Sequence, residues 1–150
     1  MSKVPKHREA APRRKTRADA PPADAEYAEA AALREALRVF DRRSVIVTRG
    51  IGLTSRTYLL LLLVKTARAG NATAGLPELE ERLQLGKSTV TELVLRTEER
   101  GFVRRDLDRT RPKGIAVHLT PAGERRLAKA VRALGDERSL LLEVLSKIRR

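Results

Sequence analysis

The chain has 150 residues, a length that suits one domain with one hydrophobic core and argues against a two-domain enzyme. Lysine and arginine number 32 against 19 aspartate and glutamate residues, so the formal charge is +13 and the pI is about 11.1. Such a basic chain is expected to bind a polyanion, either the phosphate backbone of a nucleic acid or an anionic membrane surface.

Several classes of protein need residues that this sequence does not supply. Cysteine is absent and histidine occurs twice, which argues against disulfides, zinc sites and histidine-based catalysis. The four aromatic residues are too few for the stacking platforms of RNA and single-strand binders. No run reaches the roughly 18 apolar residues of a membrane span, and no signal-peptide pattern is seen. We therefore expect a cytoplasmic, nucleoid-associated protein that is not an enzyme, has no cofactor, metal or membrane contact, and binds duplex DNA.

Residues 1–24 are predicted to form a disordered basic segment. The segment contains four prolines and almost no large apolar side chain. Its first 17 residues have seven basic residues and one acidic residue, which makes +6 of the total charge of +13. The segment could be an expression remnant, a degradation-prone tail or a second DNA anchor.

Two helices are predicted next. Between Glu26 and Arg43, apolar residues fall at i, i+3, i+4 and i+7, namely Leu33, Ala36, Leu37 and Phe40. After a break at residues 50–53, Thr54 is a candidate N-cap for a helix through the apolar run 58–64, ending at Gly70. A buried strand is the alternative for this run, but the scarcity of β-branched residues favours a helix at the centre of the core.

The segment 76–100 indicates two short helices joined by a tight turn. Pro77 suits the first turn of the first helix, and Gly86 would cap the second, Lys87 to Arg100. The second helix is expected to place Val90, Leu93, Val94 and Thr97 inward. Its outer face is then polar, with several short side chains, and consists of Lys87, Ser88, Thr89, Thr91, Glu92 and Arg96.

A β-hairpin and two further helices complete the prediction. Strands at Phe102-Val103 and Ile115 to Leu119 flank a basic loop that contains Arg109, Arg111 and Lys113. Thr120 and Pro121 are in the preferred cap and N1 positions of a helix. Two apolar stripes follow, separated by Gly135, and they are expected to pack against a second subunit together with the helix at 26–43.

Two short helices followed at once by a basic hairpin predict a winged helix-turn-helix. A helix fits the major groove of DNA, and cationic hairpin residues suit the narrow minor groove. The candidate DNA-binding residues are Lys87, Ser88, Thr89, Thr91, Glu92, Arg96, Arg109, Arg111 and Lys113. Glu92 is the unusual member, since a carboxylate near phosphates is repelled unless it accepts from a cytosine amino group.

From Leu53 to Gly123 the sequence resembles the MarR (multiple antibiotic resistance regulator) family. The resemblance lies in Leu53-Thr54, in the segment from Glu78 to Thr91, in Glu98 to Arg105, and in Val117 to Gly123, in this order and at the family's spacing. It departs from the family in the wing, where Arg111 and Lys113 replace the usual Asp and Arg. In the second helix, Leu95 and Thr97 stand where the pattern prefers Asp and Leu.

The resemblance implies a mainly α protein with a small β-hairpin wing, in which N- and C-terminal helices form a homodimer. Dimerisation helices are expected at about 25–44 and 121–150, within a single domain 25–150, and the DNA-binding lobe at about 53–120. The family binds a pseudopalindromic operator and is commonly a repressor released by a small anionic or aromatic effector; Arg42 and Tyr58 are the candidate pocket residues. The alternative is a nucleoid-type architectural protein that binds DNA without strong sequence preference.

Overall fold

The computed structural model describes residues 20–148, so most of the predicted disordered segment lies outside the described residues. The helices are α1 (Asp24–Gly50), α2 (Ser55–Lys65), α3 (Leu76–Leu83), α4 (Lys87–Glu99), α5 (Pro121–Ala133) and α6 (Gly135–Ile148). The strands are β1 (Thr73–Gly75), β2 (Val103–Asp108) and β3 (Gly114–Leu119). The predicted mainly α fold with a small β-hairpin wing is confirmed.

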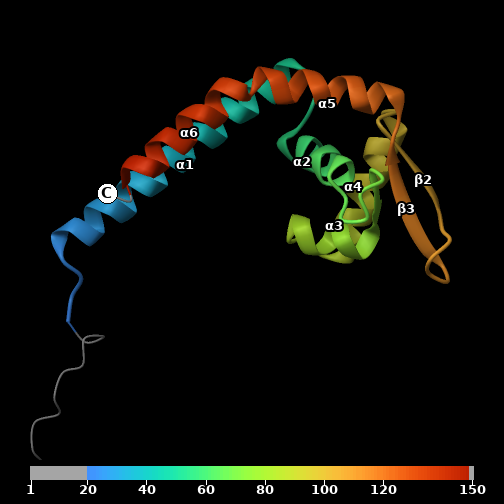
Figure 1. Ribbon diagram of the computed structural model, residues 1–150, viewed down its shortest axis with the longest axis horizontal. Helices are drawn as coiled ribbons and strands as arrows, with labels where there is room; N and C mark the ends of the chain where they lie inside the picture. The colour runs from blue at the N-terminus through green and yellow to red at the C-terminus, as the bar shows by residue number, and fades with distance from the viewer. Residues whose placement is uncertain (1–19, 149–150) are drawn as a thin grey trace, which may run out of the picture.

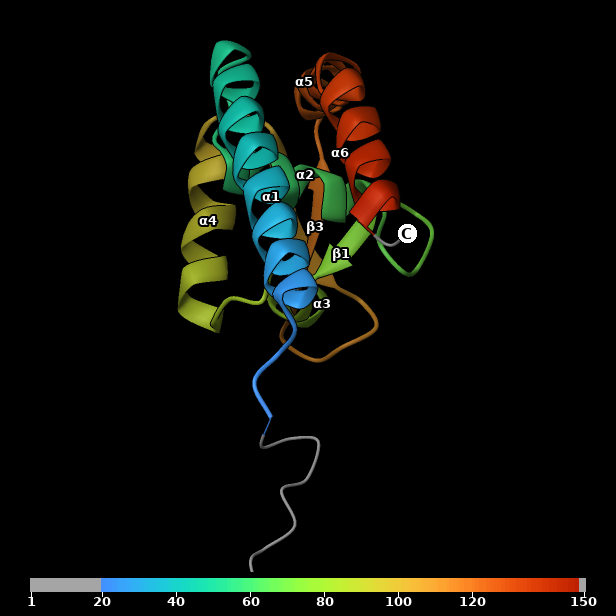
Figure 2. The same cartoon turned by 90° about the vertical axis from the view of Figure 1, so that its left-hand side faces the viewer.

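The molecule consists of a helical arm and a lobe. In the arm, α1 and α6 lie side by side along most of their length (Figure 1). The lobe contains α2, α3, α4 and the sheet, and α5 leads from the sheet back to the arm (Figures 1 and 2). The helix-turn-helix of α3 and α4 is therefore held in one body, and the long helices project from it.

The core lies in the lobe, around α2. Leu60, Leu61 and Val64 of this helix are fully buried. They pack with buried residues of α3, α4 and the sheet, namely Leu79, Val90, Val94, Val103 and Val117. The run 58–64 is therefore a central core helix as predicted, and Thr54 caps it by accepting a hydrogen bond from the backbone nitrogen of Thr57 at 3.1 Å.

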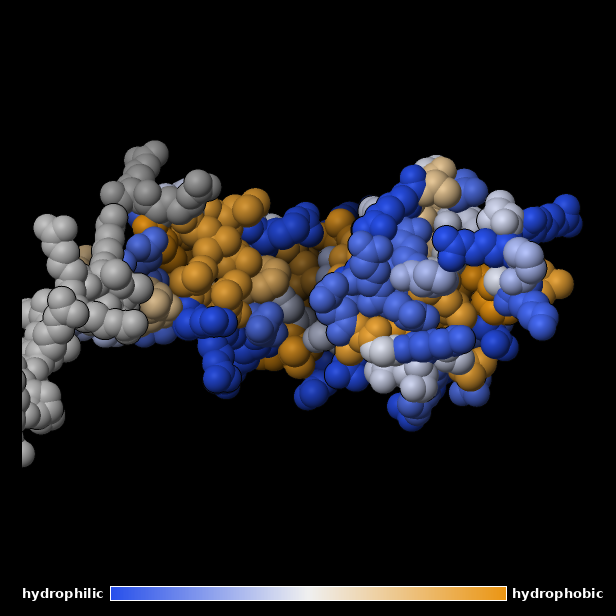
Figure 3. Space-filling view, turned by 90° about the horizontal axis from the view of Figure 1, so that it is seen from below, coloured by the Kyte–Doolittle hydropathy of each residue, from blue (hydrophilic) through white to orange (hydrophobic). Residues whose placement is uncertain are grey.

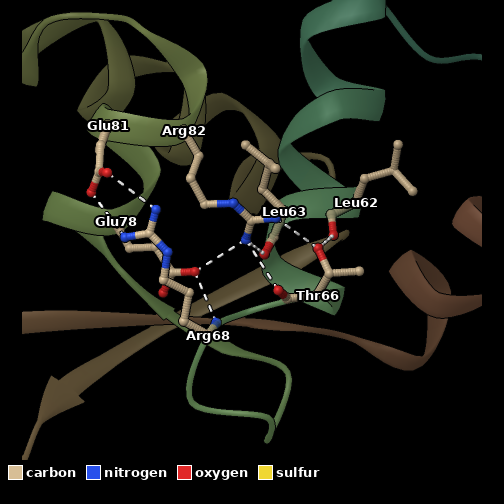
Figure 4. Close-up of polar contacts among 7 residues, drawn as sticks. All are labelled: Leu62, Leu63, Thr66, Arg68, Glu78, Glu81 and Arg82. Atoms are coloured by element: carbon tan, nitrogen blue, oxygen red, sulfur yellow. Dashed lines mark hydrogen bonds and ion pairs between the residues drawn. The ribbon is translucent and has the colours of Figure 1, made fainter.

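Two helix ends differ from the prediction. The first helix continues to Gly50, because Thr48 is buried in the core and its hydroxyl donates to the carbonyl of Ser44 at 2.8 Å. Helix α2 ends at Lys65 and not at Gly70. Arg82 of α3 donates to the free carbonyls of Leu63 and Thr66, both at 3.1 Å (Figure 4). Burial of Thr48 in the folded chain and the contacts of Arg82 thus decide these two helix ends, and local propensity alone does not.

The sheet has a strand that was not predicted. Strand β1 pairs antiparallel with β3, with Thr73 opposite His118, and the strand order is β1-β3-β2. The three residues of β1 are too few to show alternation of polar and apolar side chains, so the sequence carries no signal for a strand here. The segment becomes a strand because it pairs with β3. Its addition anchors the wing to α3, since β1 leads directly into that helix.

Candidate nucleic-acid interface

Helix α3 is fixed against the end of α2 by two arginines, Arg82 of α3 and Arg68 of the segment that follows α2. Arg82 forms an ion pair with Glu78 at 3.1 Å while it binds the end of α2 (Figure 4). Arg68 donates its backbone nitrogen to Glu78 at 2.9 Å and its guanidinium to Glu81 at 2.9 Å. The pKa of Glu81 is lowered, first by the hydrogen bond from Arg68. These contacts fix α3 against α2 and so orient the turn that leads into α4.

Helix α4 presents the polar face that its sequence predicts. Val90, Val94 and Thr97 are buried. The buried hydroxyl of Thr97 is satisfied by the carbonyl of Leu93 at 2.7 Å, which explains how a polar residue fits this core position. On the opposite face, Thr91 is half-buried and the other predicted residues are exposed: Lys87, Ser88, Thr89, Glu92 and Arg96.

The unusual acid on this face is neutralised within the helix. Arg96 forms an ion pair with Glu92 one turn away. Glu92 therefore need not repel phosphates, and its position between two shallow grooves remains available to a base edge. One groove, of about 450 Å³, is lined by Lys87, Ser88, Thr91, Glu92 and Leu95.

The second groove, of about 420 Å³, adds residues that the sequence analysis did not single out. Thr89, Glu92 and Arg96 line it together with Ser55 and Arg56 from the start of α2. Arg56 is exposed and lies two residues after the capping residue Thr54, in the first turn of α2, and this position after a cap was the signal available in the sequence. The polar surface of α4 thus extends onto the N-terminal end of α2.

The wing tip is a structured cationic loop. Asp108 accepts hydrogen bonds from the hydroxyl of Thr110 at 2.6 Å and from the backbone nitrogen of Thr110 at 2.9 Å, and these lower the pKa of Asp108. Arg109, Arg111 and Lys113 are exposed, and within residues 20–148 none of them forms an ion pair. Arg111 lines a groove with residues of the α3 side of the lobe, so the tip and α4 form separate surfaces.

Glu98 connects α4 to the wing. Its carboxylate accepts from the backbone nitrogen of Arg105 at 3.0 Å and from Nε of Arg105 at 2.7 Å. The backbone hydrogen bond, followed by the side-chain hydrogen bond, lowers the pKa of Glu98. The contact joins the last turn of α4 to β2 and sets the wing relative to the helix.

Replacing Glu98 by Gln should destabilise the protein by about 0.5–1 kcal/mol at neutral pH, because both partners are partly exposed. A lowered folded-state pKa means that the stabilisation is complete above the unfolded value of about 4.3 and is lost as pH falls through the folded pKa. Urea unfolding of wild type and variant should therefore differ near neutral pH, and the difference should shrink as pH falls below the unfolded pKa of about 4.3. A difference that persists at acid pH would contradict this role of the carboxylate.

The candidate effector residues are not in these grooves. Arg42 is exposed on α1, and Tyr58 is half-buried on α2. Burial raises the pKa of Tyr58, and the charge of Arg138 opposes this shift. Neither Arg42 nor Tyr58 lines the two grooves beside α4 or the groove at the wing tip, and their role in an effector pocket stays a prediction.

Two general features bear on other classes of function. Within the described residues, no group of three or more His, Asp or Glu side chains could hold a metal ion. By length and apolar composition, none of the described helices alone could cross a membrane; α1 and α2 pass this test only as a pair, bent by 85°.

Among known proteins, solved structures share the fold of this chain. No model of a protein family matches the sequence, and no curated protein is similar to it. Among solved structures, AbsC, a MarR family transcriptional regulator from Streptomyces coelicolor, is similar with a TM-score of 0.72 and 20% identity, over 86% of this chain and 90% of that one. A mutant of MarR from E. coli complexed with operator DNA gives a TM-score of 0.61 at 20% identity, over 77% and 89%.

A third similar structure is NadR in complex with 4-hydroxyphenylacetate. Its TM-score is 0.64 at 18% identity, over 75% of this chain and 77% of NadR. The chain therefore has the winged-helix fold of MarR-family regulators, as the sequence motifs predicted. In chain order, α3 and α4 form the helix-turn-helix of this fold, and the hairpin β2–β3 is its wing.

Proposed function

We propose that this protein is a transcriptional regulator that binds double-stranded DNA in a sequence-specific manner, with α4 in the major groove and the wing on the adjacent backbone or minor groove. The observation that carries the proposal is the polar outer face of α4, in a chain whose wing tip has three exposed cations that form no ion pair within residues 20–148. The fold shared with operator-bound MarR supports it. Regulation by DNA binding needs no catalytic group, and we propose that the protein is cytoplasmic and not an enzyme.

The regulator acts as a homodimer whose subunits join through the helical arm. In Figure 3 the arm shows a continuous apolar area, whereas the lobe is largely hydrophilic. No residue of α6 is buried, and an apolar groove of about 330 Å³ runs between α1 and α6, lined by Val39, Phe40, Leu140, Leu141 and Val144 among others. An exposed apolar surface of this kind is typical of a subunit interface.

A homodimer joined through the arm has two α4 helices, one for each half-site of a pseudopalindromic operator.

The test is a binding measurement on two duplexes. A palindromic site is selected from random DNA with the full-length protein, and fluorescence anisotropy then compares it with a scrambled duplex at physiological ionic strength. We expect half-sites spaced by one helical turn and at least about 10³-fold tighter binding to the selected site. Equal affinity for both duplexes, with a steep salt dependence, would instead support a nucleoid-type architectural protein.

Two variants of α4 should separate base contacts from phosphate contacts. Ser88 is exposed, and its hydroxyl makes no hydrogen bond with the described residues. Ser88→Ala should therefore reduce the binding preference for one base over the others, at one position of the site, by about 1–3 kcal/mol. Arg96→Ala should weaken binding to all duplexes and lower the salt slope by about one. Anisotropy titrations over several salt concentrations measure both effects. Unchanged binding by both variants would show that α4 is not the helix in the groove.

We also propose that DNA binding responds to a small anionic or aromatic effector. NadR, with the same fold, is known in complex with 4-hydroxyphenylacetate. Tyr58 and Arg42 remain the candidate residues.

A further inference from the structure

A second cationic groove lies at the elbow, where the α1–α2 turn meets α5. This elbow groove has a volume of about 570 Å³ and is lined by Arg49, Gly50, Ile51, Gly52, Ala122, Arg125, Arg126 and Lys129. Four of these residues are cations, and none is an acid. In the described part of the chain, none of the four forms an ion pair. The DNA-binding surface described above uses none of these residues.

The floor of the elbow groove is fixed by two arginines that hold the α1–α2 turn. Arg126 donates to the carbonyl of Ile51, and Arg100 donates to the carbonyl of Gly52. Both guanidinium groups also lie over the ring of Phe102, 5.2 Å and 5.0 Å from its centroid. Gly52 has φ +80°, and a Cβ there would lie 2.8 Å from Nη1 of Arg126. These hydrogen bonds hold the α1–α2 turn in one position, so the floor of the elbow groove is already formed before a ligand binds.

Three cations remain free at the rim of this fixed floor. Arg125 and Lys129 lie one turn apart on α5, a like-charge spacing that destabilises a helix. Glu124 is the acid next to them, but it pairs with Lys65 at 2.9 Å. Arg49 approaches from α1. Within residues 20–148, no acidic side chain forms an ion pair with these three cations.

Phosphate is the chemistry that matches these groups best. Guanidinium groups bind phosphate oxygens with two parallel hydrogen bonds, and an ammonium group adds a point charge. The volume is that of a small-molecule site. Only Ile51 and Ala122 contribute apolar side chains to the lining, which leaves little surface for an aromatic carboxylate.

The elbow groove lies at the opposite end of the lobe from the wing tip. Ala122 follows the end of β3, whereas the tip lies beyond the other end of the six-residue strands, about 20 Å away. Figures 1 and 2 show α5 and the end of α1 above the lobe and the wing loop below it. A duplex held by the wing tip and the start of α4 leaves the groove free.

We propose that the elbow groove binds a small molecule with a diphosphate or triphosphate group. Arg49, Arg125 and Lys129 contact the phosphate oxygens, while Arg126 and Arg100 hold the turn. The ligand would join α1 of the arm to α5 and so restrain the angle between arm and lobe. The binding step does not depend on the DNA-binding function and can be measured without DNA.

The test uses tripolyphosphate with the full-length protein in isothermal titration calorimetry at physiological ionic strength. We expect one saturable site per subunit. Arg125→Gln/Lys129→Gln should weaken it by about tenfold or more, because charge-assisted hydrogen bonds are lost. Without tripolyphosphate, the same variant should melt about 1 °C higher than wild type, since like-charge repulsion is relieved. Arg49→Gln, on another helix, should also weaken binding.

The control variant Arg34→Gln/Arg132→Gln removes the same charge from exposed positions outside the groove and should bind tripolyphosphate like wild type. Equal weakening by both double variants would show nonspecific attraction to the +13 chain and overturn the proposal. The absence of saturable binding by wild type would also overturn it. So would an equal loss of affinity for a DNA duplex in Arg125→Gln/Lys129→Gln, because the groove would then be a DNA contact.

Discussion

Val39→Arg is expected to convert the dimer into a monomer. Val39 lines the apolar groove of the arm and is 50% exposed in the single chain, so the isolated subunit tolerates a charged side chain there. In the dimer this charge would be buried without a partner, at a cost of about 3 kcal/mol or more. Because the substitution occurs in both subunits, the dissociation constant of the dimer should increase by more than about 100-fold. Sedimentation equilibrium measures the change directly.

The loss of the dimer should also remove most operator affinity. A monomer engages one half-site and loses the gain in affinity that two linked recognition helices provide. Ser146→Arg is the matched control, since Ser146 is exposed on α6 outside the groove. It should remain a dimer and bind the operator normally. If Val39→Arg stays dimeric at the concentrations where wild type does, the arm groove is not the subunit interface, while the assignment of α4 and the wing would still stand.

Gly123→Ala should destabilise the lobe by about 3 kcal/mol and lower the melting temperature by about 10 °C. A Cβ at Gly123 would lie 2.0 Å from the carbonyl oxygen of Phe102. That oxygen is held by the backbone nitrogen of Thr120 at 3.0 Å, and Thr120 also caps α5 by accepting from the nitrogen of Gly123 at 3.0 Å. The clash is with backbone and not with a flexible side chain, so relief requires moving the junction of wing and α5.

Gly50→Ala provides the matched control for this steric argument. Gly50 is the last residue of α1, and a Cβ there would meet nothing within 4 Å. The melting temperature of Gly50→Ala should equal that of wild type or be slightly higher, because alanine is a better helix former than glycine. Thermal unfolding followed by circular dichroism compares the two variants. A melting temperature of Gly123→Ala within about 2 °C of wild type would show that α5 can shift away from the strand.

The interface residues on α4 were accessible to sequence reasoning because one helix contains all of them. With a period of 3.6 residues, burial of Val90 and Val94 places Ser88 and Glu92 outside. The same periodicity places Arg96 one turn from Glu92, but only the structure shows that the two side chains form an ion pair. The wing tip was likewise predicted as a basic loop, whereas the hydrogen bonds of Asp108 that shape it were not.

The amino-acid sequence by itself determined the helices of the arm and lobe, the caps at Thr54 and Thr120, and the polar face of α4. These features depend on residues within a few positions of one another, where spacing and capping chemistry act directly. Tertiary structure alone decided the end of α2 at Lys65, the existence of β1, and the elbow groove that joins Arg49 to Arg125. Each of these requires partners distant in sequence, and their proximity is set by packing around the core and not by local preference.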